Sequence, residues 1–139
     1  MAAVVVDAGP LVALFDQSDR HHRWAEERVE EMRFPLLVCE PVLTEAMYLL
    51  AGFWSAQEEL MSLIEDEVIA IGFQIDEHFS AVRQLLQKYR EVPMSLADAC
   101  VVRMAEIHDG SAVFTLDSDF TVYRKNVRMP IDLIYPPFS

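Results

Sequence analysis

The sequence predicts an α/β domain in which a parallel sheet of four to five strands is covered by helices on both faces, a three-layer α/β/α arrangement. Three observations support this class. Short β-branched or apolar runs alternate along the chain with longer segments whose apolar residues have helical spacing. The connections are mostly short, so we expect right-handed crossovers. The 139 residues, 53% of them hydrophobic and 24% charged, fit one globular domain over residues 1–139.

The first third of the chain is predicted to contain two strands and two helices. Residues 4–6 are a β-branched run and predict a buried strand. The helix that follows, 10–15, begins at a proline, which suits a first helical turn. Residues 18–33 are predicted to form a charged helix, whose start Ser18 or Asp19 can cap. Residues 36–39 are predicted to form the second strand.

The middle of the chain continues the alternation. A predicted helix over 41–50 begins with Pro41 and ends near Gly52. Ser55 can cap the next predicted helix, 55–65. Residues 68–73 predict a third strand. Asp76 can cap a predicted helix over 76–89, in which the apolar residues have helical spacing.

The last third is predicted to hold one long helix and two strands. Residues 95–108 form the helix, which Gly110 ends. Residues 112–115 form the fourth strand, and 117–123 a turn with a short helix. Residues 131–134 form the last strand, which two prolines close.

The composition argues for an intracellular chain. Cys39 and Cys100 lie 61 positions apart inside apolar patterns, so we expect reduced core thiols in a cytoplasmic protein rather than a disulfide. No apolar run is long enough to span a membrane. The first residues lack a basic region, and we expect no signal peptide.

The net charge of −12 limits the modes of nucleic-acid binding. Residues 34–82 contain nine acids and no Lys or Arg. Such a balance disfavours a protein that coats nucleic acid passively, because that function needs a basic face. It does not exclude an enzyme that meets nucleic acid through bound metal ions.

Five acids fall where this architecture places a site. Asp7 directly follows the first predicted strand, and Asp117 and Asp119 follow the fourth. Glu45 and Asp98 lie early in helices. Open parallel sheets bind ligands beyond the carboxyl ends of their strands, and helix N-termini point to that edge. One crevice can therefore collect all five carboxylates.

Each acid also has a purely structural interpretation. Asp117 can cap the short helix after it, Asp98 can complete a capping box with Ser95, and Glu45 can face solvent. The combination favours a site, because Asp7, Glu45 and Asp98 fall inside apolar stretches. Buried carboxylates without partners are costly, so several in one place need cations.

The ligand types indicate which cations. Carboxylate oxygens without accompanying Cys or His suit hard ions such as Mg²⁺ or Mn²⁺. Two such ions can activate water and stabilise the leaving oxygen of a phosphodiester. An acidic protein can cut an anionic polymer by this chemistry.

Four segments, in this order and spacing, resemble the PIN domain family, which includes VapC-type toxins. The resemblance extends over nearly the whole chain. The segments are Val5-Val6-Asp7 with the following Pro-Leu-Val-Ala-Leu-Phe, Leu43-Thr-Glu45, Leu96-Ala-Asp98-Ala99, and Phe114-Thr-Leu-Asp117-Ser-Asp119-Phe120.

The resemblance implies a parallel sheet flanked by helices and an acidic pocket for one or two Mg²⁺ or Mn²⁺ ions. Asp119 matches a fifth, more variable acid of the family, and Thr115 a hydroxyl residue often found beside the acids. The four core acids match Asp7, Glu45, Asp98 and Asp117.

The function implied is a metal-dependent endoribonuclease, the toxin of a toxin–antitoxin pair, with RNA as substrate and a possible antitoxin as partner. The alternative is a catalytically silent PIN-like module that only binds protein or RNA. A dehalogenase-like phosphatase is disfavoured, because Asp7-Ala8-Gly9 lacks its paired acids. A compact basic group, Arg124, Lys125 and Arg128, is a candidate to steer a phosphate backbone.

The helices after the second strand contain more apolar residues than one buried stripe needs. Such a surplus predicts an interface, and VapC-like proteins typically form two-fold dimers, so we expect a homodimer. The residues are Leu43, Met47, Leu49, Leu50, Phe53, Trp54, Leu60, Met61 and Leu63.

Overall fold

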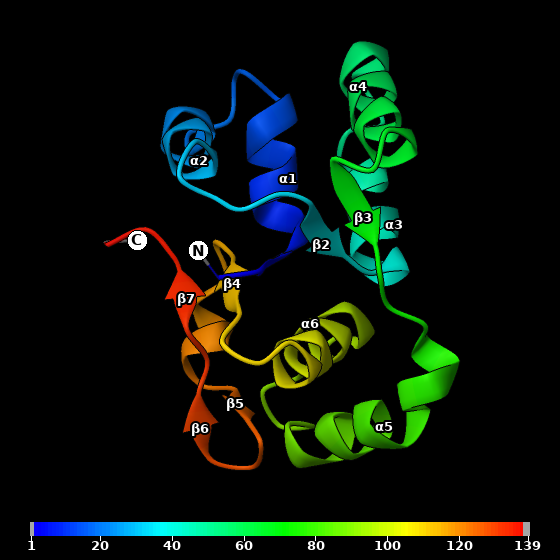
Figure 1. Cartoon of the computed structure of the whole chain (residues 1–139), viewed down its shortest axis with the longest axis vertical. Helices are drawn as coiled ribbons and strands as arrows, with labels where there is room; N and C mark the ends of the chain where they lie inside the picture. The colour runs from blue at the N-terminus through cyan, green and yellow to red at the C-terminus, as the bar shows by residue number, and fades with distance from the viewer. Residues whose placement is uncertain (1, 138–139) are drawn as a thin grey trace.

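The computed structural model describes residues 2–137, and its centre is a five-stranded parallel sheet with the strand order β3-β2-β1-β4-β7 (Figure 1). All four neighbouring pairs are parallel. Helices lie on both faces, so the predicted three-layer class is confirmed. The strands are β1 (Val4–Val6), β2 (Leu36–Val38), β3 (Ile69–Ile71), β4 (Ala112–Phe114) and β7 (Leu133–Ile134).

The helices divide between the two faces of the sheet. In Figure 1, α1, α2 and α4 lie above the sheet, and α5 and α6 lie below it. α1 packs against α2 and α3, and α5 packs against α6. Two short 3-10 helices, η1 (Ile75–His78) and η2 (Ser118–Thr121), complete the set. The helices are α1 (Ala8–Phe15), α2 (His22–Val29), α3 (Glu40–Leu49), α4 (Trp54–Glu65), α5 (Phe79–Lys88) and α6 (Leu96–Ile107).

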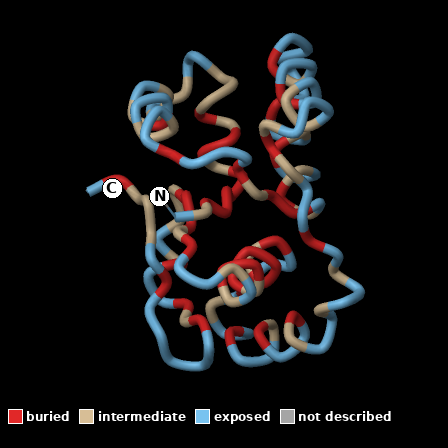
Figure 2. The backbone as a smooth tube through the Cα atoms, in the orientation of Figure 1, coloured by how far each residue is buried: buried red, intermediate tan, exposed pale blue. Residues whose placement is uncertain are grey.

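The core lies along the central strands and around α6. Val5, Val6 and Val113 are fully buried, and Trp24 of α2 packs on Phe114 with ring centroids 5.6 Å apart. Seven of the twelve residues of α6 are buried (Figure 2). α6 is therefore a central helix, and its N-terminus is fixed by the packing of the whole domain.

The C-terminal region differs from the prediction. A two-stranded antiparallel sheet joins β5 (Arg124–Lys125) to β6 (Met129–Pro130), and the last strand is only β7. The sequence did not reveal this hairpin, because its turn places Asn126 and Val127, and no glycine, at positive φ (49° and 77°). Turns of this kind are usually recognised by glycine.

Two predicted helix starts also shift. α2 begins at His22, because the carboxylates of Asp16 and Asp19 accept hydrogen bonds from the backbone N–H groups of Ser18 and His21 and close a turn before the helix. The segment predicted as one helix over 76–89 divides into η1 and α5.

The two cysteines are free thiols, and both are buried, as expected. Within residues 2–137, the longest helices have 12 residues, and none of the described helices is suited to cross a bilayer, which takes about 20 apolar residues.

β1 occupies the middle of the sheet, with β2 on one side and β4 on the other. Along the chain, β2 and β3 are placed on one side of β1, and β4 and β7 are then placed on its other side. The order of the strands therefore reverses next to β1. In open parallel sheets, the crevice at such a reversal, beyond the carboxyl ends of the strands, is where ligands bind. Asp7 follows β1 and Asp117 follows β4 at this edge.

Candidate active site

A cavity of about 540 Å³ opens at this edge, and four of the five predicted acids line it. The fifth, Asp119, is close to two of them: one carboxylate oxygen from each of Asp98, Asp117 and Asp119 lies within 4.8 Å of the others. We call this cavity the acid pocket. Its lining residues are Asp7, Gly9, Glu45, Leu49, Ser95, Asp98, Leu116 and Asp117.

Asp7 is the most buried of the acids. It occupies the N-cap position of α1, but its side chain makes no capping hydrogen bond. Instead, Thr115 donates its hydroxyl to Oδ2 of Asp7 at 2.8 Å. Burial raises the pKa of Asp7 to about 6, against the lowering effect of the hydrogen bonds from Thr115 and the Ala8 backbone. Without a cation, this carboxylate is costly to ionise.

Thr115 links the two strand ends. Its hydroxyl oxygen also accepts the backbone N–H of Asp117 at 3.0 Å. Asp117 in turn accepts the backbone N–H of Asp119 at 2.9 Å and so caps η2. The structural interpretation of Asp117 is therefore correct, and it is compatible with a place in the acid pocket.

Asp98 likewise has two environments. It completes the predicted capping box of α6: its N–H donates to Oγ of Ser95 at 3.0 Å, and its Oδ2 faces the backbone N–H of Ser95 at 3.5 Å. The same Oδ2 accepts the hydroxyl of Tyr123 at 2.9 Å. The helix cap and the tyrosine together orient this carboxylate in the pocket.

Sequence reasoning missed Tyr123. The residue is fully buried, and its ring packs edge-on against Tyr89 and Phe120. Burial, with the Asp98 carboxylate, raises the pKa of Tyr123 far above its usual range, so the hydroxyl remains a donor. No local pattern marks this residue, since its contact with Asp98 depends on how the segment between η2 and β5 packs near α6.

Glu45 and Asp119 complete the electrostatics of the pocket. The pKa of each is raised, first by burial and then by the neighbouring carboxylates Asp98 and Asp117. Repulsion between the carboxylates contributes to the raised pKa values, as such a cluster predicts. In the structure, burial is the larger cause for Asp7, Glu45 and Asp119 alike.

The pocket fits a hard divalent cation. The three clustered ligand oxygens are carboxylates, with no Cys or His among them, which is the donor set that Mg²⁺ or Mn²⁺ prefers. A cation would also relieve the cost of ionising the buried Asp7. Asp98, Asp117 and Asp119 would hold it, with Asp7 and Glu45 on the same cavity wall.

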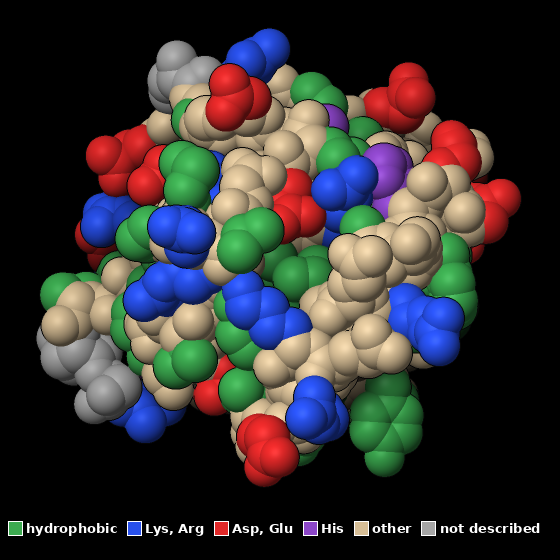
Figure 3. All heavy atoms as spheres, turned by 90° about the horizontal axis from the view of Figure 1, so that it is seen from below, with side chains coloured by type: hydrophobic (Ala, Val, Ile, Leu, Met, Phe, Trp, Pro, Cys, Tyr) green, Lys and Arg blue, Asp and Glu red, His purple; other side chains and the backbone are tan. Residues whose placement is uncertain are grey.

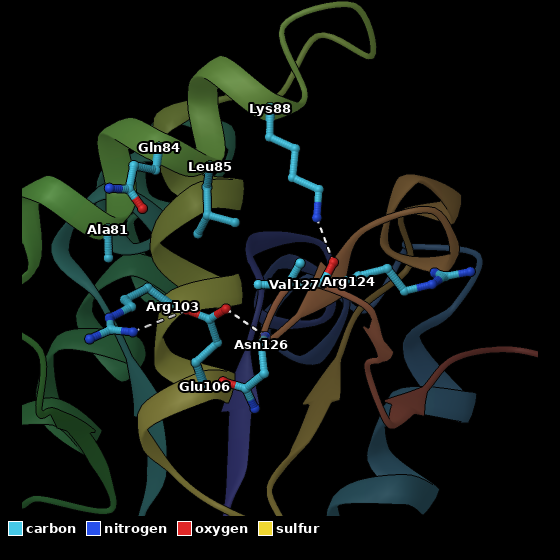
Figure 4. Close-up of a pocket in the computed structure, with 9 residues that line it drawn as sticks. All are labelled: Ala81, Gln84, Leu85, Lys88, Arg103, Glu106, Arg124, Asn126 and Val127. Atoms are coloured by element: carbon cyan, nitrogen blue, oxygen red, sulfur yellow. Dashed lines mark hydrogen bonds and ion pairs between the residues drawn. The ribbon is translucent and has the colours of Figure 1, made fainter.

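The predicted basic group is only partly exposed. Lys125 is buried, and the guanidinium of Arg124 donates to three backbone carbonyls between residues 121 and 123. Arg124 lines a cavity of about 340 Å³ together with Lys88 and Arg103, and Figure 4 shows its guanidinium end directed away from them. Arg128 is exposed.

Basic residues nevertheless concentrate on this side of the molecule. Seven of the eleven Lys and Arg residues fall within residues 83–128. Figure 3, which views the α5 side, shows several Lys and Arg side chains on one face, among apolar, polar and acidic side chains. Most of the basic side chains of this acidic protein therefore come from one part of the chain, where acidic residues accompany them.

The fold and the carboxylate cavity together are those of an α/β nuclease domain. Comparison with known families agrees: the PIN domain matches residues 4–126. The chain belongs to the PIN domain family, whose members are nucleases.

Among solved structures, the chain is similar to the Mycobacterium tuberculosis toxin VapC20, described as cleaving the sarcin–ricin loop. The TM-score is 0.73 at 18% sequence identity, and the match covers 86% of this chain and 94% of that chain. At this identity, the likeness concerns the fold. No curated protein matches the chain.

Proposed function

We propose that the chain is a metal-dependent endoribonuclease that hydrolyses RNA phosphodiester bonds, with Mg²⁺ or Mn²⁺ as cofactor. The observation that supports this most directly is the clustering of Asp98, Asp117 and Asp119 within 4.8 Å beside the buried Asp7. We further propose that it acts in the cytoplasm as the toxin of a toxin–antitoxin pair, in keeping with its similarity in fold to VapC20.

The roles of the residues follow from their surroundings. Asp98, Asp117 and Asp119 bind the cation, and Asp7 and Glu45 complete the negative field around it. Thr115 and Tyr123 hold Asp7 and Asp98 in place by donating hydroxyl hydrogen bonds. When bound, the cation supplies activation of water and stabilisation of charge on the leaving oxygen.

Cleavage of single-stranded RNA by the purified chain tests the proposal. We expect cleavage with Mn²⁺ or Mg²⁺, none with EDTA, and a loss of at least about 100-fold in Asp98→Asn, because removing one ligand charge weakens the cation site. Asn retains the side-chain oxygen that completes the helix cap, so the variant should fold. Asp109→Asn is the matched control, since this exposed residue lies at the opposite edge of the sheet, beside Ala3 and Leu37.

Wild-type cleavage rates in Asp98→Asn would refute the assignment of this site. The thermal midpoint provides a second readout, because a cation that binds only the folded chain raises it by mass action. A rise with Mn²⁺ and no cleavage of any RNA would favour the catalytically silent PIN-like module instead.

We also propose that the chain forms a homodimer. Five apolar residues of the α3–α4 region are exposed, and we call them the α3–α4 patch: Tyr48, Leu49, Phe53, Trp54 and Met61. Leu49 also lines the acid pocket, so a partner on this patch would sit beside the site. An antitoxin with a basic segment would be attracted by the field of the acids.

RNA approaches the pocket past cationic side chains in this proposal. Arg128 is exposed at the tip of the β5–β6 hairpin, and Arg124 holds the hairpin against η2 through its bonds to backbone carbonyls. Because Lys125 is buried, its contribution is to the hairpin and to the local field.

A further inference from the structure

A second cavity, of about 620 Å³, adjoins the acid pocket. It lies between the first turns of α3, the segment after β3, and the start of α6. Two residues, Glu45 and Ser95, line both cavities, so the two spaces lie side by side. A ligand whose phosphate reaches the acids therefore extends directly into this second space, which we call the side cavity.

The walls of the side cavity are mainly apolar. Phe73 lies almost fully buried at its base, and Leu96 is 45% exposed at its rim. Pro41 and Ile75 add further apolar surface. Among the described residues that line it there is no Lys, Arg or His. This lining disfavours a phosphate group and suits a flat, largely apolar group, which in RNA is the base.

Most polar side chains of the side cavity are acceptors, and the exception is Ser95, whose hydroxyl oxygen accepts the backbone N–H of Asp98 and whose proton can be donated. The carboxylates of Glu40 and Glu45 can only accept hydrogen bonds. The hydroxyl of Thr44 donates its proton to the backbone carbonyl of Glu40 at 2.9 Å, so it offers the cavity only an acceptor. A base whose edge presents donors fits this arrangement. Guanine offers N1–H and the 2-amino group side by side, a pair that a carboxylate can accept with both oxygens.

We propose that the side cavity binds the base of a nucleotide beside the bond that is cut, and that it selects guanine through Glu40. This inference rests on the proposed ribonuclease function, and it adds a sequence preference to it. The base packs between Leu96 and Pro41, while its donor edge faces the carboxylate at the start of α3.

Photocrosslinking tests where the base lies without requiring cleavage. Short single-stranded RNAs with one 6-thioguanosine keep both donors of guanine, and the Asp7→Asn variant is expected to leave them intact. We expect crosslinks at residues of the side cavity, such as Phe73 or Leu96, mapped by mass spectrometry. Crosslinks confined to other surfaces would overturn the proposal and would leave the cavity to a protein partner.

Product sequencing tests the selectivity of the wild-type chain. We expect guanine to be enriched at one position next to the cut, and Glu40→Gln to reduce that enrichment about tenfold with less effect on total cleavage. Glu27→Gln, an exposed change on α2, is the matched control. Cleavage with no base preference would overturn the inference and leave the ribonuclease proposal intact. No cleavage of any RNA would refute the ribonuclease proposal. The crosslinking experiment would still decide whether the side cavity binds a base.

Discussion

At the scale of single residues, the site depends on two hydroxyl groups as well as on its carboxylates. Thr115 donates to Asp7, and Tyr123 donates to Asp98. Both hydroxyls are on buried residues, so neither can be replaced by water without rearrangement. Each therefore fixes the orientation of one acid before any cation binds.

Replacing Asp7 should stabilise the metal-free protein at neutral pH. Its pKa rises from 3.8 unfolded to about 6 folded, so wild-type stability falls as pH rises from about 4 to 6. Asp7→Asn lacks this loss, and above pH 6 it should be more stable by up to about 3 kcal/mol. Urea unfolding in EDTA at pH 4 and pH 7.5 measures the difference. Equal stability of the two proteins at pH 7.5 would contradict the assigned burial cost.

Removing the hydroxyl of Tyr123 should weaken the cation site more than the fold. We expect Tyr123→Phe to raise the Mn²⁺ concentration for half-maximal cleavage by about tenfold or more, because partners that orient ligands are worth that much. The loss of unfolding free energy should be about 1 kcal/mol. Tyr89→Phe is the control, since that hydroxyl accepts the Arg124 backbone N–H and contacts no acid. An unchanged Mn²⁺ requirement in Tyr123→Phe would show that the hydrogen bond has no part in binding.

The acids of the site could be located from the sequence and the tyrosine could not. Asp7 directly follows β1 and Asp117 lies shortly after β4, and strand ends can be read from short apolar runs. Asp98 stands in a capping box, which is also a local pattern. Tyr123 meets Asp98 across 25 positions through the packing of aromatic rings, and no spacing rule encodes that contact.

At the scale of elements, local chemistry explains both the predictions that succeeded and those that failed. α6 begins where its capping box predicts, because Ser95 and Asp98 satisfy backbone groups within the same turn. The β5–β6 hairpin was missed, since Asn126-Val127 lacks the glycine that marks a turn with positive φ. α2 starts late because two earlier acids close a turn first.

The turn of this hairpin offers a test at the element scale. Val127 has a φ of 77°, which is unfavourable for a β-branched residue, and its side chain is 73% exposed. Val127→Gly should therefore stabilise the fold by about 1 kcal/mol, as measured by thermal or urea unfolding. Val122→Gly, at an exposed position with negative φ, should instead destabilise it. A destabilised Val127→Gly would show that the turn is not strained.

At the scale of the whole molecule, charge and apolar surface are segregated. The acids dominate residues 34–82, basic residues concentrate in 83–128, and the α3–α4 patch is exposed. A chain with a net charge of −12 repels its own copy, so an apolar patch is the plausible source of attraction in a homodimer.

The association of two chains should therefore depend on salt. We expect sedimentation to show a dimer that weakens at low ionic strength, where repulsion between like charges is least screened. Trp54→Ser should shift the chain to monomer, because it removes a large ring of the α3–α4 patch that is 73% exposed. Phe79→Ser, an exposed aromatic on α5, is the control. A wild-type monomer at all salt concentrations would refute the dimer.

The bond between Thr115 and Asp7 joins residues 108 positions apart, and this separation has a consequence for synthesis of the protein. A ribosome translates the codons of Asp117 and Asp119 long after the codon of Asp7. Until β4 and the segment after it have been made, the nascent chain lacks Asp117 and Asp119 as well as one of the two strands that pair with β1. The proposed metal site therefore forms only after Asp119 has been synthesised, and products that terminate before Asp117 lack two of its three clustered carboxylates.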